Sequence, residues 1–156
     1  MITAIICDLD GSLCEITHRL RHVTNGGHDW DAFFAGIPHD DLCEPIAEIL
    51  HAFNVIDEHA VLLVSGRPEK CRNDTEAWLS RHRIDYDELR MRPDNDSRPD
   101  HVVKMEILDA ILRDGYEPFL VIDDRISVVE AWRARGLTCL QCAPSDHVIQ
   151  IGRAHV

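Results

Sequence analysis

The sequence predicts an α/β protein built on a parallel sheet, and three observations support this fold class. Short, nearly continuous apolar runs recur along the chain, as in strands that are buried on both faces. Segments with apolar residues at helical spacing alternate with these runs. Gly115 and Gly136 each follow such a segment, where a glycine ends a helix well. Together they predict a three-layer, Rossmann-like sheet with helices on both faces, in a single domain over 1–156.

The first half of the chain is expected to contain two buried strands and two helices. In order, these are a strand at 2–7, a polar and irregular segment at about 11–40, a helix at about 43–57, a strand at 60–64 and a helix at about 69–81. Glu44-Pro45 favours a helix start, because proline suits the first turn. The strand at 60–64 is expected to end where Ser65-Gly66-Arg67-Pro68 begins.

The second half continues the alternation. Its elements are a short strand at 89–92, a polar loop at 93–99, a helix at 101–113, a strand at 119–122, a helix at about 127–135, a strand at 137–142 and a polar tail. In the segment at 101–113, Val103, Ile107 and Ile111 recur at helical spacing, which predicts the helix there.

Composition excludes several classes of protein. Apolar residues make up 45% of the 156 residues, which suits a folded domain and not a disordered chain. No apolar run reaches the roughly 18 residues of a membrane span, and no charged-then-apolar leader is present, so we expect no membrane association and a cytoplasmic protein. The net charge of −12 weighs against broad electrostatic binding to nucleic acid. This net charge does not exclude a small basic pocket that binds one phosphate group.

The six cysteines are scattered, and we expect them to be reduced thiols. Cys139 and Cys142 have the spacing of a zinc knuckle, but no second pair completes four ligands. Both also fall in the strand predicted at 137–142, where an offset of three sends two side chains to opposite faces. We therefore interpret them as core cysteines.

The most informative motif follows the first strand as Asp8-Leu9-Asp10-Gly11-Ser12. Residues two apart in a strand share a face, so the carboxylates of Asp8 and Asp10 are expected side by side. Two like charges held together are costly unless a cation neutralises them, which predicts a Mg²⁺ site. A solvated turn is the alternative, since Asp and Gly are ordinary turn residues.

Polar residues with complementary chemistry follow other strands as well. Ser65-Gly66-Arg67 follows the strand at 60–64, Asp123-Asp124 follows the strand at 119–122, and Lys104 lies in the helix that precedes the latter. Parallel sheets bind ligands at the carboxyl ends of their strands, so these groups are expected to meet. Carboxylates for Mg²⁺, a hydroxyl, a guanidinium and an ammonium are suited to phosphoryl transfer. No GxxxxGK[ST] loop for ATP is present.

These residues resemble the haloacid dehalogenase-like phosphohydrolases, whose four motifs stand here in order as Asp8-Leu9-Asp10-Gly11-Ser12, Ser65, Lys104 and Asp123-Asp124. The resemblance implies that Asp8 attacks phosphorus and forms an aspartyl-phosphate. It implies that Asp10 protonates the leaving oxygen and then deprotonates water. Ser65 and Lys104 would hold the transferred phosphoryl group. The implied Mg²⁺ ligands are Asp8, the Asp10 carbonyl, Asp123 and Asp124.

A closer resemblance is to the phosphatase domain of phage-type polynucleotide kinase/phosphatase. It is carried by Ser65-Gly66-Arg67, Met91-Arg92, the stretch from Asp96 to Lys104, and Ile122-Asp123-Asp124-Arg125. It covers 2–13 and about 60–147 well and 14–58 poorly, and the kinase domain is missing. It implies removal of 3′-phosphates from nucleic acid ends. The implied substrate-binding residues are Gly66, Arg67, Arg98, Asp100, Arg125, and either Arg19 or Arg21 from the loop after the first motif.

Simpler interpretations stand beside these roles. Ser65 could cap the next helix, Arg67 could form a surface ion pair, and Asp100 could be the N-cap of the helix at 101–113. The aromatic cluster at 30–34 could line a substrate cap or merely cover the core.

Three further hypotheses remain open. The acidic net charge would suit a phosphatase of free nucleoside monophosphates. The insertion at about 12–40 is too short for a large cap, so the crevice should be open to a polymer end, or closed by an oligomer. A separate kinase or ligase partner could supply the missing activities. A receiver-type signalling domain also combines acidic residues, Mg²⁺ and a lysine. In that class the lysine comes last along the chain, whereas here Lys104 precedes the second acidic pair, so the order does not match.

Overall fold

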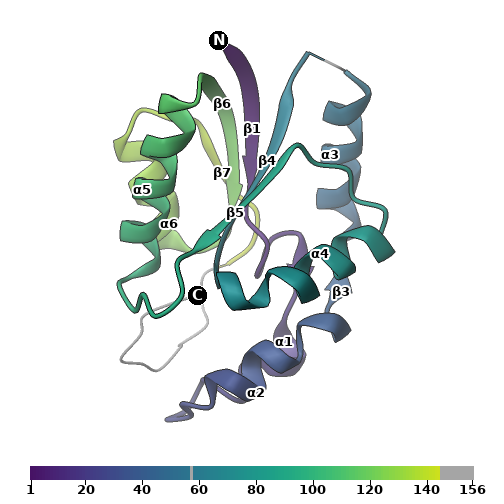
Figure 1. Cartoon of the computed structure of the whole chain (residues 1–156), viewed down its shortest axis with the longest axis vertical. Helices are drawn as coiled ribbons and strands as arrows, with labels where there is room; N and C mark the ends of the chain where they lie inside the picture. Colours follow the sequence, from purple (N-terminus) through teal and green to yellow (C-terminus); the bar gives the residue numbers. More distant parts are fainter. Residues whose placement is uncertain (57, 145–156) are drawn as a thin grey trace.

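The computed structural model describes residues 1–56 and 58–144 and contains a five-stranded sheet in the order β5-β4-β1-β6-β7 (Figure 1). Every neighbouring pair in this sheet is parallel. The strands are β1 (Ile2–Cys7), β4 (Ala60–Pro68), β5 (Glu88–Arg92), β6 (Tyr116–Asp123) and β7 (Cys139–Gln141). The predicted α/β class with a parallel sheet is confirmed.

Helices cover both faces of this sheet (Figure 1). The helices on one face are α3 (Glu44–Val55) and α4 (Arg72–Arg81), and those on the other are α5 (Asp100–Arg113) and α6 (Ile126–Ala134). Alternate residues of β1 serve the two layers, because Ile5 packs with the α3 and α4 side chains while Ile6 packs with those of α5 and α6. This is the three-layer arrangement that the apolar runs predict.

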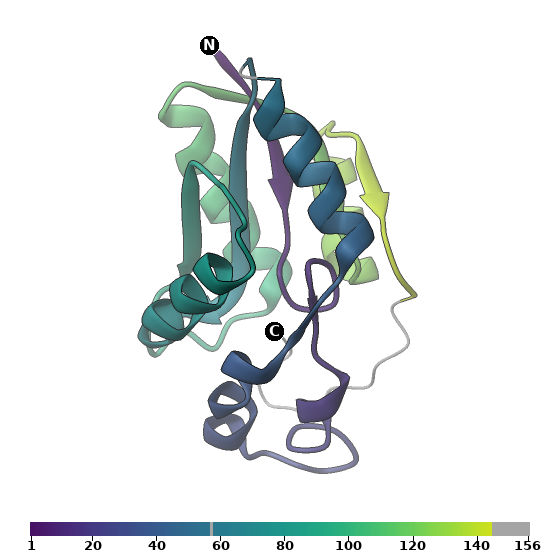
Figure 2. The same cartoon turned by 90° about the vertical axis from the view of Figure 1, so that its right-hand side faces the viewer.

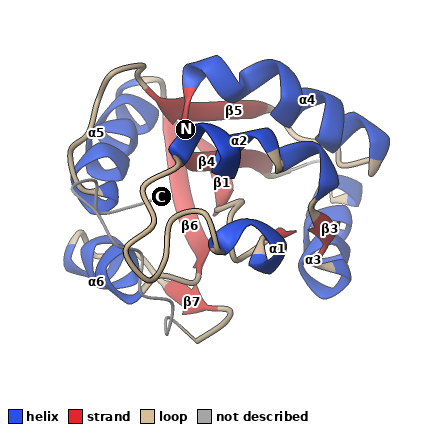
Figure 3. Ribbon diagram, turned by 90° about the horizontal axis from the view of Figure 1, so that it is seen from below, coloured by secondary structure: helices blue, strands red, loops and turns tan. Residues whose placement is uncertain are grey.

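Short elements fill the segment between β1 and α3, and they lie beyond the carboxyl ends of the sheet strands (Figures 2 and 3). They are β2 (Cys14–Glu15), α1 (Thr17–Leu20), α2 (Trp30–Ala35), the 3₁₀ turn η1 (Ile37–His39) and β3 (Asp41–Leu42), with β2 and β3 paired antiparallel. The expectation of an irregular segment at 11–40 was wrong here. Elements of two to six residues are too short to show a hydrophobic period.

The aromatic cluster of this segment covers the core. Phe33 and Phe34 are buried, and the ring centroids of Trp30, Phe33 and Phe34 lie 5.4–5.8 Å apart. Of the two interpretations of this cluster, the structure therefore favours packing for both phenylalanines.

Several boundaries differ from the predictions, including those of β6 and β7, and the differences at β4, α4 and α5 bear on the site. β4 continues to Pro68, because a register shift after Ser65 lets Pro68 pair with Arg92 of β5. The helix expected at 69–81 divides into the 3₁₀ turn η2 (Glu69–Cys71) and α4. The interpretation of Asp100 as an N-cap was wrong, since Pro99 is the cap residue and Asp100 is the first residue of α5.

All six cysteines are free, and Cys139 is buried in β7 as predicted for a core residue, whereas Cys142 lies just beyond β7 and is half-buried. Among the described helices, none has the length and apolar character needed to cross a lipid bilayer. The polar tail predicted at the end of the chain falls on residues 145–156 and lies outside the described residues.

Candidate active site

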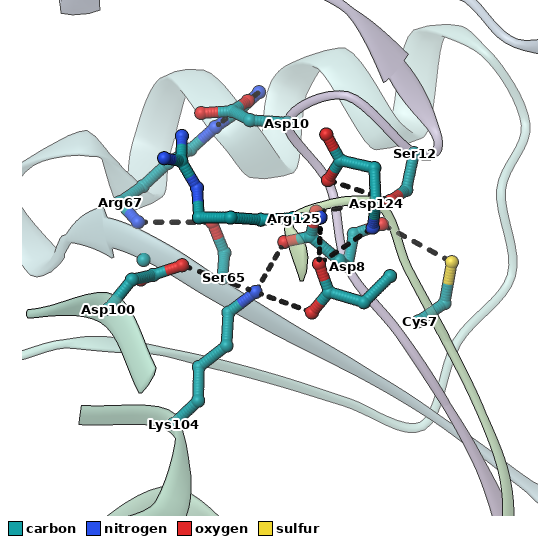
Figure 4. Close-up of polar contacts among 12 residues, drawn as sticks. Cys7, Asp8, Asp10, Ser12, Ser65, Arg67, Asp100, Lys104, Asp124 and Arg125 are labelled. Carbon is teal, nitrogen blue, oxygen red and sulfur yellow. Dashed lines mark hydrogen bonds and ion pairs between the residues drawn. The ribbon is translucent and has the colours of Figure 1, made fainter. Parts of the chain in front are cut away.

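Three carboxylates meet at the carboxyl ends of β1 and β6. One oxygen each from Asp8, Asp123 and Asp124 lies within 4.8 Å of the others, and all three residues are buried. Lys104 of α5 reaches this group, and its Nζ donates to Asp8 Oδ1 at 2.8 Å and to Asp123 Oδ2 at 2.9 Å (Figure 4). We call these four residues the acidic cluster.

The sheet register explains why the acidic cluster forms. Cys7 of β1 pairs with Ile122 of β6, so the residues that follow, Asp8 and Asp123, leave adjacent strands at the same level. The chain then turns at Gly11, which has φ +85°. A Cβ on Gly11 would lie 2.2 Å from Asp124 Oδ2, so a larger residue would displace that carboxylate. Glycine is required here for both reasons.

Burial and mutual repulsion shape the titration of these carboxylates. The pKa of Asp8 is raised well above its usual value by burial and by Asp123, although Lys104 opposes the shift. Burial and the charge of Asp123 raise the pKa of Asp124 to about 6. Burial lowers the pKa of Lys104, but the surrounding carboxylates outweigh it and the net shift is upward. The raised pKa values show that these carboxylates repel one another when ionised despite the one ammonium group, and their oxygen donors fit a Mg²⁺ ion.

A second group of charges lies around Asp10. Asp10 Oδ1 accepts from Arg19 Nη2 at 2.8 Å and from Arg67 Nε at 3.0 Å. Asp40 faces the same two arginines, accepting from Arg19 Nε at 2.8 Å and from Arg67 Nη2 at 3.1 Å. We call these four residues the arginine cluster, and each of them is at most 7% exposed.

The arginine cluster keeps Asp10 ionised. Burial alone would raise the pKa of Asp10, but the charges of Arg19 and Arg67 outweigh burial and lower it far below the usual value. Two buried atoms of this cluster, Asp10 Oδ2 and Arg19 Nη1, have no hydrogen-bond partner within the described part of the chain. Buried polar atoms are normally paired, so these two are available to a ligand.

Asp100 lies against β4 and Lys104. Its Oδ2 is 3.5 Å from Lys104 Nζ, and its Oδ1 is 3.4 Å from Arg92 Nη2. A Cβ on Gly66 would lie 2.1 Å from Asp100 Oδ1, so the glycine allows the carboxylate to approach the strand. Ser65 is buried beside it, and its Oγ accepts from the backbone N–H of Arg67 at 3.1 Å. Figure 4 shows Ser65 and Asp100 on the Lys104 side of the site.

The remaining predicted arginines differ in position. Arg21 is exposed at the end of α1, whereas Arg19 is buried in the arginine cluster. Arg98 is exposed, and its guanidinium pairs with the carboxylates of Asp96 and Glu106. Arg125 is half-buried, and its positive charge lowers the pKa of Asp124.

Sequence reasoning assigned no role to Asp40 or Ser12. Ser12 Oγ donates to Asp8 Oδ2 at 3.1 Å. Its place directly after Gly11 was a usable signal. Asp40 lies between η1 and β3, where no hydrophobic period or motif distinguishes it from neighbouring acids, so only the tertiary structure identifies it.

Comparisons with known proteins identify the family and the fold that this chain resembles. The family model described as the polynucleotide kinase PNKP phosphatase domain matches residues 2–147. A chain in the solved Pnkp1/Rnl/Hen1 complex is 35% identical with a TM-score of 0.79, and the match covers 94% of this chain and 47% of that one. A hydrolase from Streptococcus pneumoniae TIGR4 shares the fold at a TM-score of 0.62 and 17% identity, with 90% and 92% of the two chains covered.

A viral relative matches over a smaller part of its length. This protein of Autographa californica nuclear polyhedrosis virus, named as a bifunctional polynucleotide kinase/RNA ligase, is 28% identical over 131 residues, which cover 83% of this chain and 18% of that protein. The chain therefore spans less than half of these two longer relatives. Because the family match extends over residues 2–147, the chain belongs to the polynucleotide kinase PNKP phosphatase domains, a family of phosphatases with the haloacid dehalogenase-like fold.

Proposed function

We propose that this protein is a Mg²⁺-dependent phosphomonoesterase that removes 3′-phosphates from nucleic acid ends through an aspartyl-phosphate on Asp8. One observation carries the proposal. The acidic cluster stands next to an arginine cluster in which Asp10 Oδ2 and Arg19 Nη1 are buried and have no partner among the described residues. A phosphate ester offers an oxygen acceptor for Arg19 Nη1, and Asp10 Oδ2 can donate to an ester oxygen once it carries a proton, while a purely structural ion cluster would leave neither atom unpaired.

The first step in this proposal is attack by Asp8. A carboxylate oxygen of Asp8 bonds to phosphorus while the bond from phosphorus to the 3′-oxygen breaks. Lys104 Nζ, 2.8 Å from Asp8 Oδ1, orients the nucleophile and offsets charge on the transferred group. Since Ser65 Oγ accepts from the Arg67 N–H, its own hydroxyl hydrogen is left to donate to a phosphoryl oxygen.

Asp10 is proposed to move the protons. It is ionised in the free protein, so it must take up a proton before it can act as an acid. The arriving phosphate carries negative charge that offsets Arg19 and Arg67 and raises the pKa of Asp10, so Oδ2 can carry a proton to the leaving 3′-oxygen. The resulting carboxylate then takes a proton from the water that attacks the phosphorus of the aspartyl-phosphate, and the attack releases phosphate and Asp8.

Mg²⁺ would be held by Asp8, Asp123 and Asp124, with the Asp10 backbone carbonyl as the fourth group that the family resemblance implies. The carboxylate of Asp10 is already engaged by two arginines, so it is not proposed as a ligand. The ion supplies positive charge for the phosphoryl oxygens.

The substrate assignment is drawn from the relatives. The longer proteins that this chain matches are named for an RNA repair complex and for polynucleotide kinase and RNA ligase activities. We therefore propose that kinase and ligase functions, on this or a separate chain, act on the same ends. The six free cysteines support a reducing, cytoplasmic setting.

A substrate panel tests the proposal. We expect release of phosphate from 3′-phosphorylated DNA and RNA oligonucleotides with Mg²⁺ and none in EDTA, with slower release from 3′- and 5′-mononucleotides. A preference for mononucleotides would favour the alternative that the net charge of −12 suggests.

Substitution of the nucleophile tests the covalent step. We expect Asp8→Asn to abolish turnover without unfolding the protein, and acid-quenched wild type to carry one phosphoryl group on Asp8. Asp109→Asn is the matched control, because Asp109 pairs with Arg135 on the exposed face of α5. An Asp8→Asn variant with wild-type turnover would contradict the mechanism.

A further inference from the structure

Asp40 has the contacts of a residue that acts on the site through its neighbours. It is 3% exposed, and its two carboxylate oxygens accept hydrogen bonds from both arginines that hold Asp10. Arg19 Nη2 donates to Asp40 Oδ2 at 2.7 Å and to Asp10 Oδ1 at 2.8 Å, so one guanidinium nitrogen bridges the two carboxylates.

We propose that Asp40 is a positioning residue that sets the guanidinium groups of Arg19 and Arg67, and through them the carboxylate of Asp10, for the reaction. This inference rests on the proposed function. It assigns Asp40 no contact with the substrate, since both of its oxygens are occupied by protein donors.

The surroundings of Asp40 are rigid enough for this role. Its backbone carbonyl accepts from Trp78 Nε1 at 2.8 Å, which ties it to α4. The Arg19 guanidinium lies 4.5 Å from the ring centre of Phe33, and Arg67 Nη1 donates to Thr75 Oγ1 at 3.0 Å. Each arginine thus has two kinds of contact: one with a side chain of the surrounding core, Phe33 or Thr75, and one with Asp40.

Charge balance supports the same conclusion. The arginine cluster contains two guanidinium groups and two carboxylates, and all four side chains are at most 5% exposed. Without Asp40, Asp10 would be the one carboxylate among the described residues that pairs with both arginines. The two guanidinium groups would be drawn toward it, and Arg19 Nη1 and Asp10 Oδ2, which have no partner in the described part of the chain, would shift from their present positions.

Asp40→Asn is the most informative variant. It keeps the size of the side chain but replaces one oxygen with an NH₂ group, which would face guanidinium donors. We expect kcat on a 3′-phosphorylated oligonucleotide to fall about 10- to 100-fold while KM changes by less than about threefold, because misplacing a catalytic group by about 1 Å has effects of this size on the chemical step. Lys104 and Ser65 are untouched and still bind the phosphate.

Two further variants separate positioning from stability. Ile111→Val removes one methylene from the core on the last turn of α5, away from Asp40, so we expect a lower Tm with nearly unchanged kcat. In an Arg19→Lys background, Asp40→Asn should cost less than about threefold in kcat, because residues that act as one unit are not additive.

The outcomes distinguish this inference from the proposed function. The inference is overturned if Asp40→Asn lowers Tm but leaves kcat unchanged, or if its effect is equally large in the Arg19→Lys background. p-Nitrophenyl phosphate is assayed in parallel, so that loss of only the 3′-end preference counts against the proposed substrate and not against Asp40. A wild-type chain inactive on both substrates would overturn the proposed function and this inference with it.

Discussion

The ammonium group of Lys104 lies among three buried carboxylates, and its replacement by methionine tests whether this site is built to hold a cation. Lys104 is 1% exposed, and its Nζ is 2.8 Å from Asp8, 2.9 Å from Asp123 and 3.5 Å from Asp100. Lys104→Met keeps an unbranched stem as far as Cε and its contacts but lacks the terminal ammonium group, so the change is mainly one of charge.

The expected cost follows from burial. Removing one partner of a buried ion pair typically costs about 3–5 kcal/mol. The pKa of Asp8 is already raised by burial and by Asp123, so Asp8 can take up a proton and keep the cost near the lower figure. For a domain of this size, about 3 kcal/mol corresponds to a decrease in Tm of about 6–12 °C.

Mg²⁺ should reverse part of this loss. A ligand at 100 times its Kd stabilises the folded state by about 2.7 kcal/mol. The variant lacks the positive charge that repels the ion, so its Mg²⁺ affinity and the resulting increase in Tm should exceed those of the wild type. Turnover should be lost, since no ammonium then faces the phosphoryl group.

Thermal unfolding in EDTA and in MgCl₂, at matched ionic strength, measures both effects. Lys70→Met is the control, because the Lys70 side chain is 57% exposed and pairs only loosely with Asp31, at 3.7 Å. Exposed pairs of this kind contribute less than about 1 kcal/mol. The reasoning is refuted if Lys104→Met has the Tm of the wild type in EDTA, or if Mg²⁺ stabilises it less than the wild type.

Three other predictions concern the same site. Gly66→Ala places a Cβ 2.1 Å from Asp100 Oδ1, so we expect a loss of about 1–3 kcal/mol in chemical denaturation, and the same change should cost much less in an Asp100→Ala background; no loss would contradict the close contact. Asp124, with a pKa of about 6 in the fold, binds its proton more tightly when folded, so the metal-free protein should lose up to about 3 kcal/mol of stability as the pH rises from about 4 to about 6. Unfolding in EDTA across this range checks the slope, which Asp124→Asn should reduce and which Mg²⁺ binding should oppose. Arg19→Lys should lower kcat/KM by at least about tenfold while Arg21→Lys has little effect, since a lysine cannot reproduce a guanidinium that bridges two carboxylates; equal effects in steady-state assays would contradict the choice of Arg19.

The parallel sheet was predictable because its strands are short apolar runs, and a strand that is buried on both faces can be recognised from such a run alone. The Asp-x-Asp motif after β1 was also legible, but the expectation that its two carboxylates lie side by side was wrong. β1 ends at Cys7, so the two-residue strand period does not hold over residues 8–10, and Asp8 and Asp10 enter different clusters. By contrast, the end of β4 was misplaced because pairing with β5 extends it through Pro68, and such pairing leaves no mark on the local sequence.

The sequence by itself determined the order of the parallel strands and of the helices between them, the acids at the ends of β1 and β6, and the lysine that precedes the second of them. It left Arg19 and Arg21 equivalent, left Asp100 open between a cap and a substrate-binding residue, and gave no sign of Asp40 or of the short elements between β1 and α3. Only the tertiary structure decided these points, because a hydrophobic period reports how deeply each residue is buried and not which buried charges meet. Asp10, Arg19, Asp40 and Arg67 come from four separate segments, and the contacts among them exist only once the sheet has formed.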